Sequence, residues 1–99
     1  MKMVIAEISV TPITDGVSVS KYVRAAYKAL VETGLKVELT PMATVMEADT
    51  IEDIFDAALR AHRAVADMGA RRIITTLKID DRRDKKVHME DKVRSVLGQ

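Results

Sequence analysis

The side chains best suited to chemistry gather in two short segments of the chain. Residues 40–49, TPMATVMEAD, are mostly apolar yet carry a carboxylate, and residues 15–23, DGVSVSKYV, carry hydroxyls; the polar members are Thr40, Thr44, Glu47, Ser18, Ser20 and Tyr22. A carboxylate in apolar surroundings is costly unless it meets a donor, a cation or water. Glu47 is therefore the leading candidate for a ligand-binding residue. The alternatives are a solvated side chain or a favourable contact with the N-terminus of the helix that follows.

Catalytic and metal-binding patterns are missing from the sequence. There is no cysteine, and the two histidines, His62 and His88, have no metal-ligand spacing. No serine sits in a GxSxG turn, and the four glycines form neither a Walker loop nor a dinucleotide fingerprint. We therefore expect no catalytic residue, no metal site and no cofactor, and we expect a protein that is not an enzyme.

Charge and composition give no support to a nucleic-acid or membrane partner. The 16 basic and 15 acidic residues nearly cancel, which removes the electrostatic argument for either partner. The three aromatic residues include no strand pair that could stack bases. The start, MKMVIAEISV, lacks the features of a signal peptide, and no apolar run approaches the roughly 20 residues that span a bilayer. We expect a soluble cytoplasmic protein.

The first half of the chain has the pattern strand, helix, strand. Residues 3–10 alternate between apolar and mixed positions, as a strand with one buried face does. Residues 11–16 form a turn, and Ser18 stands where an N-cap is expected. Residues 19–34 have helical apolar spacing and end at a glycine, and residues 35–42 alternate again.

The second half repeats this pattern. Residues 43–47 predict a short strand, and Asp49 or Thr50 is expected to cap a helix that ends at Gly69. Residues 72–79 are rich in β-branched side chains and predict the last main strand. The chain therefore reads as two successive β-α-β halves.

Two such halves predict one α+β domain, residues 1–99, with the ferredoxin-like β-α-β-β-α-β fold: an antiparallel four-stranded sheet with both helices on one face. A small doubly wound parallel sheet is disfavoured, because no crossover helix separates the second and third strands. The uncovered face is half apolar, and monomers seldom expose large apolar patches. We therefore expect sheet-to-sheet homodimerisation through Ile5, Glu7, Ser9, Ile74 or Ile73, and Val45 or Met46.

From about residue 80 the chain carries an extension to this fold. Residues 80–86, DDRRDKK, are a dense run of mixed charge, and residues 87–97 predict a short helix with an apolar side. One interpretation is a solvated loop with a helix packed on the domain edge. The other is an oligomer contact, or an anion site formed by Arg82 and Arg83.

Several segments together resemble one known family over almost the whole chain. The segments are EISVTP, SVSKYV, PMATVMEA and the ending IDDRRDKK-HMEDKVRSVL, and the family is the thiamine-binding-protein-like, or MTH-YkoF-like, family. The resemblance implies ferredoxin-like subunits assembled as dimers or as dimers of dimers, that is, homotetramers. It also implies a non-catalytic protein that binds thiamine or its hydroxymethylpyrimidine moiety.

The resemblance also implies site residues. The family's TxxEG-type signature falls on residues 44–48, where Thr44 and Glu47 match and Ala48 replaces the glycine. Our hypothesis is that Glu47 and Thr44 orient the pyrimidine, since a carboxylate can accept from its exocyclic amine. Further contacts are expected from the serine-rich helix start and from a methionine packed on the ring; these residues are Ser18, Ser20, Tyr22, Met42 and Met46.

A second hypothesis belongs to a different functional class. An oligomeric regulatory or scaffold protein could hold an inorganic anion at Arg82 and Arg83, or at the helix start near Ser18. Thermal shifts with thiamine, hydroxymethylpyrimidine, phosphate and sulfate separate the two hypotheses.

Overall fold

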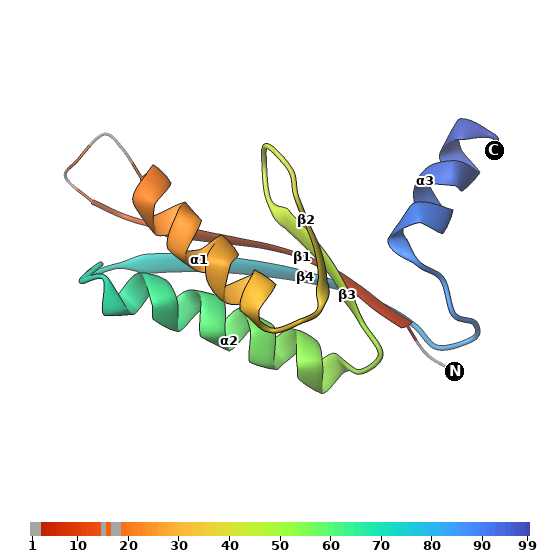
Figure 1. The fold of residues 1–99 in the computed structure, drawn as a ribbon, viewed down its shortest axis with the longest axis horizontal. Coiled ribbons are helices and arrows are strands. Elements are labelled where there is room, and N and C mark those ends of the chain that lie inside the picture. Colours follow the sequence, from red (N-terminus) through yellow and green to blue (C-terminus); the bar gives the residue numbers. More distant parts are fainter. Residues whose placement is uncertain (1–2, 15, 17–18) are drawn as a thin grey trace.

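The described chain forms four strands and three helices in the predicted order. The computed structural model describes residues 3–14, 16 and 19–99, and Figure 1 shows their arrangement. The elements are β1 (Met3–Pro12), α1 (Ser20–Glu32), β2 (Lys36–Leu39), β3 (Thr44–Ala48), α2 (Ile51–Asp67), β4 (Ile73–Arg82) and α3 (Met89–Leu97). The two β-α-β halves are confirmed.

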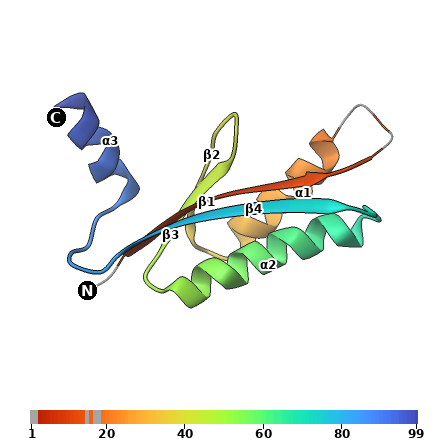
Figure 2. The ribbon, with the colours of Figure 1, turned by 180° about the vertical axis from the view of Figure 1, so that it is seen from behind.

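The four strands make one antiparallel sheet in the order β2-β3-β1-β4. In its register Ile5 lies opposite Glu47 on β3 and opposite Asp80 on β4. Both α1 and α2 cover one face of this sheet, whereas α3 stands away from it beyond one end (Figures 1 and 2). The ferredoxin-like prediction is confirmed, and the antiparallel pairing excludes the doubly wound alternative.

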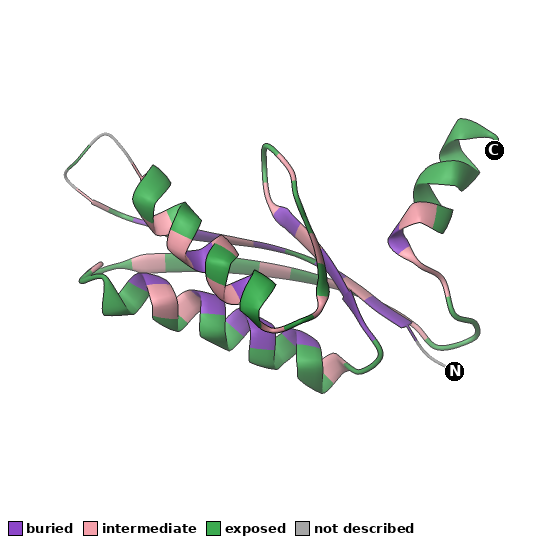
Figure 3. Ribbon diagram, in the orientation of Figure 1, coloured by how far each residue is buried: buried purple, intermediate pink, exposed green. Residues whose placement is uncertain are grey.

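The core lies between the sheet and the two covering helices. Alternate residues of β1 point into it, as the period of a strand requires. The helices close it with their own apolar stripes, and Figure 3 shows the buried positions along the surfaces that meet. The largest fully buried side chains are Leu30, Met46, Ile54, Val4 and Val65.

Local signals fix the helix boundaries. The Thr50 side chain accepts a hydrogen bond from the Asp53 amide at 3.2 Å, so Thr50 is the N-cap of α2. Gly34 and Gly69 follow α1 and α2 with φ of 80° and 95°, a left-handed conformation that glycine adopts at low cost. Val19 occupies the N-cap position of α1. The predicted cap Ser18 lies outside the described residues.

The predicted ends of three strands, β4, β1 and β2, were wrong by a few residues. The last strand continues past residue 79 to Arg82, because the beginning of β1 needs a partner: Met3 lies opposite Arg82, and Ile5 lies opposite Asp80. The first strand likewise runs to Pro12, inside the predicted turn. The mixed-charge run therefore begins as strand, and its alternating charges fit because one face of the sheet is open to solvent.

The second strand is shorter than predicted. It ends at Leu39, and a tight turn over residues 40–43 leads into β3. The Thr40 amide donates to the Ala43 carbonyl oxygen at 2.9 Å, and the Thr40 hydroxyl donates to the same oxygen at 2.7 Å. This side-chain bond stabilises the turn and ends the ladder.

The register also decides which residues the open face carries. Ile5 and Val45 border a dent on that face, together with charged side chains. The alternation along β4 places Ile74, which is exposed, on the same face. Met46 and Ile73, the other members of the two predicted alternatives, belong to the core or pack against it.

Candidate functional site

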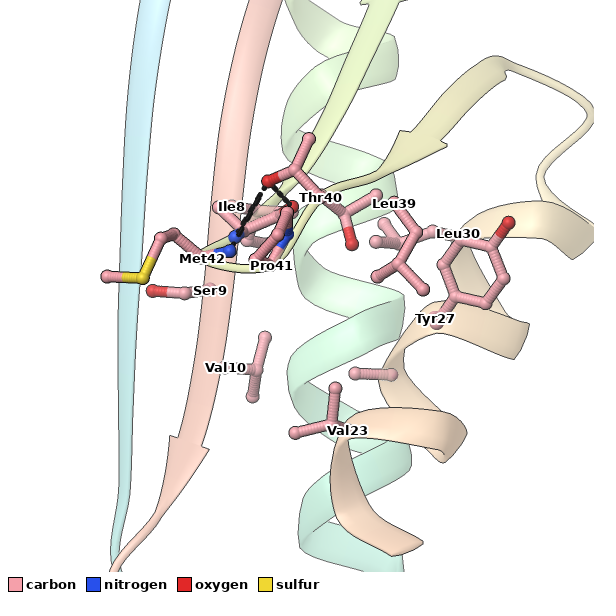
Figure 4. Close-up of a pocket in the computed structure, with 13 residues that line it drawn as sticks. Ile8, Ser9, Val10, Val23, Tyr27, Leu30, Leu39, Thr40, Pro41 and Met42 are labelled. Atoms are coloured by element: carbon pink, nitrogen blue, oxygen red, sulfur yellow. Dashed lines mark hydrogen bonds between the residues drawn. The ribbon is translucent and has the colours of Figure 1, made fainter. Parts of the chain in front are cut away.

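A hollow of about 140 Å³ lies between α1 and the turn that joins β2 to β3. Figure 4 shows the residues that line it. Residues 8–10 of β1 contribute its floor, α1 contributes one wall with Val23, Tyr27 and Leu30, and residues 39–44 contribute the other. The hollow is therefore built where the two β-α-β halves meet.

The lining is uncharged and mostly apolar, with four hydroxyl-bearing side chains. The Thr40 hydroxyl is engaged in its own turn, where it donates to the Ala43 oxygen and accepts from the Ala43 amide at 3.2 Å. The hydroxyls of Tyr27 and Thr44 make no side-chain hydrogen bond within the described residues. The Ser9 side chain faces the open side of the sheet, since Ser9 pairs with Thr76. Tyr27 and Thr44 therefore offer hydroxyls to a ligand.

Backbone groups of β1 are also available to a ligand, because β3 is shorter than β1. The last pair between β1 and β3 is Ile8 with Thr44, so residues 9–12 of β1 pair only with β4 in the described chain. In an antiparallel strand each residue directs its N–H and C=O to one edge, and its neighbour directs them to the other. Either Ser9 or Val10 therefore presents a donor and an acceptor side by side at the edge that borders the hollow.

Only some of the candidate residues reach this hollow. Thr44 lines it, and Met42 lies at its rim with an exposed fraction of 87%. Ser20 is the exposed first residue of α1, and Tyr22 packs against the core; neither lines the hollow. Met46 is fully buried in the core. The candidate Ser18 lies outside the described residues.

Glu47 points away from the hollow. Along β3, Thr44 and Met46 face the helices, so Glu47 faces the open side of the sheet. Its side chain is only 6% exposed. One carboxylate oxygen lies 3.0 Å from His88 Nδ1, and the other accepts from the Met89 amide at 2.9 Å. The helix N-terminus beside Glu47 is thus that of α3, not that of α2, which the sequence offered as an alternative.

A cluster of charges surrounds this carboxylate. Lys36 Nζ lies 3.7 Å from Glu47 Oε1 and also donates to the Glu90 carboxylate. That hydrogen bond lowers the pKa of Glu90 and raises the pKa of Lys36. Lys92 Nζ donates to Asp80 at 2.6 Å. These polar links tie the first turn of α3 to β2, β3 and β4.

The two arginines of the tail each face a carboxylate of their own chain. Arg82 donates to both oxygens of Asp84, from Nε at 2.6 Å and from Nη2 at 3.1 Å. This hydrogen bond lowers the pKa of Asp84 to about 2. Arg83 Nε lies 3.6 Å from Asp81 Oδ2. An anion at this place would compete with these carboxylates.

Among residues 3–14, 16 and 19–99, no group of three or more histidine or acidic side chains is arranged to hold a metal ion. In that part of the chain no helix has the length and apolarity to cross a membrane. His62 is engaged, since its Nδ1 lies 2.7 Å from the Thr75 hydroxyl.

Ser9, Tyr27 and the free edge of β1 were not predicted as site elements. A signal for Tyr27 was available, because it lies four residues after Val23 and three before Leu30 on the inward side of α1. The free edge follows from unequal strand lengths, which sequence patterns define poorly.

Comparison with known families decides the relationship. A family model described as thiamine-binding protein matches residues 6–97. The chain belongs to the thiamine-binding protein family. This membership confirms the resemblance that the sequence indicated, and it supports a role in binding a small molecule. The family is described as one of binding proteins, without reference to catalysis.

Similar proteins span nearly the full chain. A UPF0045 protein of Methanothermobacter thermautotrophicus is 43% identical, with 95% of this chain and 96% of the relative covered. The UPF0045 protein YqgV of Bacillus subtilis is 40% identical, with 95% and 94% covered. The crystal structure of the hypothetical protein MJ1052 of Methanocaldococcus jannaschii has a TM-score of 0.90 at 37% identity, and both chains are covered completely.

A structure from Thermotoga maritima, assigned provisionally to thiamine biosynthesis or salvage, has a TM-score of 0.81 at 24% identity. The comparison covers 95% of this chain and 98% of that one. At this identity the likeness concerns the fold alone.

Proposed function

We propose that the hollow beside α1 binds the aminopyrimidine ring of thiamine or of free hydroxymethylpyrimidine, and that the protein acts by binding and not by catalysis. The observation that carries this proposal is the free edge of β1, which offers a backbone donor beside an acceptor at an uncharged hollow. An aminopyrimidine has the matching edge, because a ring-nitrogen acceptor lies next to the exocyclic amine.

The volume of the hollow fits one of the two rings of thiamine and not both. An apolar cavity of about 150 Å³ accepts benzene, and this hollow measures about 140 Å³. The thiazolium ring of thiamine would therefore remain outside, in water. A phosphate would remain outside as well, since burying a charge beside uncharged groups is costly.

The side chains of the hollow provide the remaining contacts. The ring would lie against Tyr27 and the apolar wall of α1, with Met42 adapting to it at the rim. The hydroxyls of Thr44 and Tyr27 would bond the ring or its hydroxymethyl group. We assign Glu47 to α3 and not to the ligand, because both of its oxygens already have donors.

Self-association is part of the proposal. The sheet face opposite α1 and α2 exposes Ile74 and half-exposes Ile5 and Val45. A second copy of the chain would cover these side chains, as a homodimer or as a dimer of dimers.

Isothermal titration of hydroxymethylpyrimidine, thiamine and thiamine diphosphate tests the ligand. We expect the free pyrimidine to bind at least as tightly as thiamine, because the second ring gains no contact inside the hollow. Thr44→Val removes one hydroxyl at nearly constant volume and should weaken binding by up to about tenfold. Thr76→Val, on the open face of β4, is the matched control and should leave affinity unchanged.

Thermal shift measurements test the class of ligand. A ligand at 100 times its dissociation constant stabilises a protein by about 2.7 kcal/mol. Stabilisation by phosphate or sulfate, without a response to either pyrimidine compound, would reject the proposal. It would favour the anion-binding scaffold with Arg82 and Arg83.

A further inference from the structure

The last helix carries an apolar stripe that its own chain leaves uncovered. In α3 only Met89 is buried, while Val93, Val96 and Leu97 are 57%, 87% and 62% exposed. The last three lie together on one exposed side of α3, beside Lys92. Figures 1 and 2 show α3 projecting beyond the end of the sheet.

These four apolar residues form one continuous line. Positions 89, 93, 96 and 97 follow the i, i+4, i+7, i+8 spacing of a single helix face. The first member is buried at the base of the helix, next to the Glu47 carboxylate that accepts from its amide. The apolar face of α3 is thus buried within the subunit at Met89 and exposed at Val93, Val96 and Leu97.

The base of α3 is pinned in place. Glu47 holds the first turn, Lys36 binds Glu90, and Lys92 binds Asp80. With these links intact, the rest of α3 is held out from the sheet, and its apolar residues Val93, Val96 and Leu97 remain uncovered by the described chain.

Beside the base of α3, the open face of the sheet has a dent of about 170 Å³. Ile5 and Val45 give it an apolar floor, and Lys92 of α3 reaches its border. Glu7 and Lys78 also border it, opposite each other in register, yet neither has an ion-pair partner within the described residues. The dent therefore combines an apolar floor with free charges of both signs.

We propose that two copies of the chain bind each other through their α3 helices, each laying Val93, Val96 and Leu97 on the partner's open face over Ile5 and Val45 while its base stays on its own subunit. This inference rests on the self-association proposed above and specifies its interface. A two-fold axis would cover both helices and both dents at once, because each subunit offers one of each.

The chemistry and the dimensions fit a second copy of this chain. The stripe is flanked by Lys92 on one side and Glu90 on the other, and the dent offers Glu7 and Lys78 at its rim. Such an apolar centre with a mixed-charge rim is the usual anatomy of an interface. The five residues 93–97 are about 7 Å long, enough to cross the roughly 5 Å between the adjacent strands β1 and β3, which carry Ile5 and Val45.

The absence of cysteine from the sequence makes a crosslinking test clean. Val96→Cys and Val45→Cys are prepared as separate proteins, mixed, and treated with a short bismaleimide. We expect a covalent dimer that contains one chain of each kind, identified by mass spectrometry. Phe55→Cys, exposed on α2 away from the open face, replaces Val45→Cys as the control and should give none with Val96→Cys.

Light scattering on the unmodified chain measures the mass of the assembly in solution. An oligomer in which Val96→Cys crosslinks only to itself would overturn the contact between α3 and the partner's open face, because the two helices would then pair with each other. The proposal of self-association would still hold. A monomer at tens of micromolar would overturn both. Val96→Asp should lower the mass of the assembly, while circular dichroism reports an unchanged fold because this side chain lies outside the core.

Discussion

Replacing Glu47 by Gln should release the base of α3 without unfolding the core. The carboxylate receives a hydrogen bond from the Met89 amide and another from His88 Nδ1. Hydrogen bonds to a charged group contribute about 1.5–3 kcal/mol, against about 0.5–1.5 kcal/mol for neutral pairs. Glutamine keeps one acceptor oxygen but turns its NH₂ group toward the second donor. The lower cost of burying a neutral amide offsets part of this loss. We therefore expect the free energy of α3 docking to become less favourable by about 2 kcal/mol.

Amide hydrogen exchange measures this effect where it occurs. A change of about 2 kcal/mol corresponds to roughly 30-fold faster exchange, at 1.36 kcal/mol per factor of ten. We expect that acceleration at the amides of α3, with Met89 foremost. The amides of β1 should exchange as before, because they open only when the core does.

The matched control is Glu38→Gln. Glu38 lies on β2, is exposed, and makes no ion pair or side-chain hydrogen bond in the described chain. Its replacement should change neither α3 exchange nor ligand affinity. Glu47→Gln should likewise leave affinity unchanged, because Glu47 and Thr44 point to opposite faces of β3. A tenfold loss of affinity with unaltered α3 exchange would refute this reasoning and return Glu47 to the ligand site.

Two further predictions concern the cap of α2 and the charged tail. Thr50→Ala removes the cap of α2 and should cost about 1 kcal/mol, which lowers the melting temperature by about 4–8 °C in a domain of this size; calorimetry against the exposed control Ser95→Ala measures it. Because Arg82 lowers the pKa of Asp84 from 3.8 to about 2, the stabilisation from this pair is full above the unperturbed pKa and is lost as pH falls through about 2. Arg82→Gln should bring the pKa of Asp84, followed by carbon NMR, back toward 3.8, and an unchanged titration would disprove the pairing.

Alternation and helix termination were enough to predict the fold. The apolar alternation of β1, the helical spacing ending at Gly34 and Gly69, and the missing crossover between β2 and β3 together permit only one simple sheet order. Strand ends were harder, because residues such as Asp80 and Asp81 have low strand propensity. They are extended because β1 begins opposite them, and this pairing is a tertiary effect.

The residues that line the proposed ligand site were predicted only in part, for a reason that the strand period explains. Thr44 and Glu47 are three residues apart, a spacing that joins side chains on a helix but separates them on a strand. With residues 43–47 already assigned to a strand, the opposite orientation could have been derived. The free edge of β1 could not, since it depends on where β3 stops.

Glu47 shows what sequence reasoning can and cannot derive about a buried charge. Its apolar neighbours required that it find donors if buried, and that requirement holds. The sequence could not say which donors, because they come from His88 and Met89, more than 40 residues later in a segment with only local helical signals. An acid that looked like a ligand contact therefore holds a helix in place. The same burial that made it a candidate binding residue pairs its oxygens with His88 and Met89 on the side of β3 away from the hollow, so the ligand that we propose is recognised there by neutral groups.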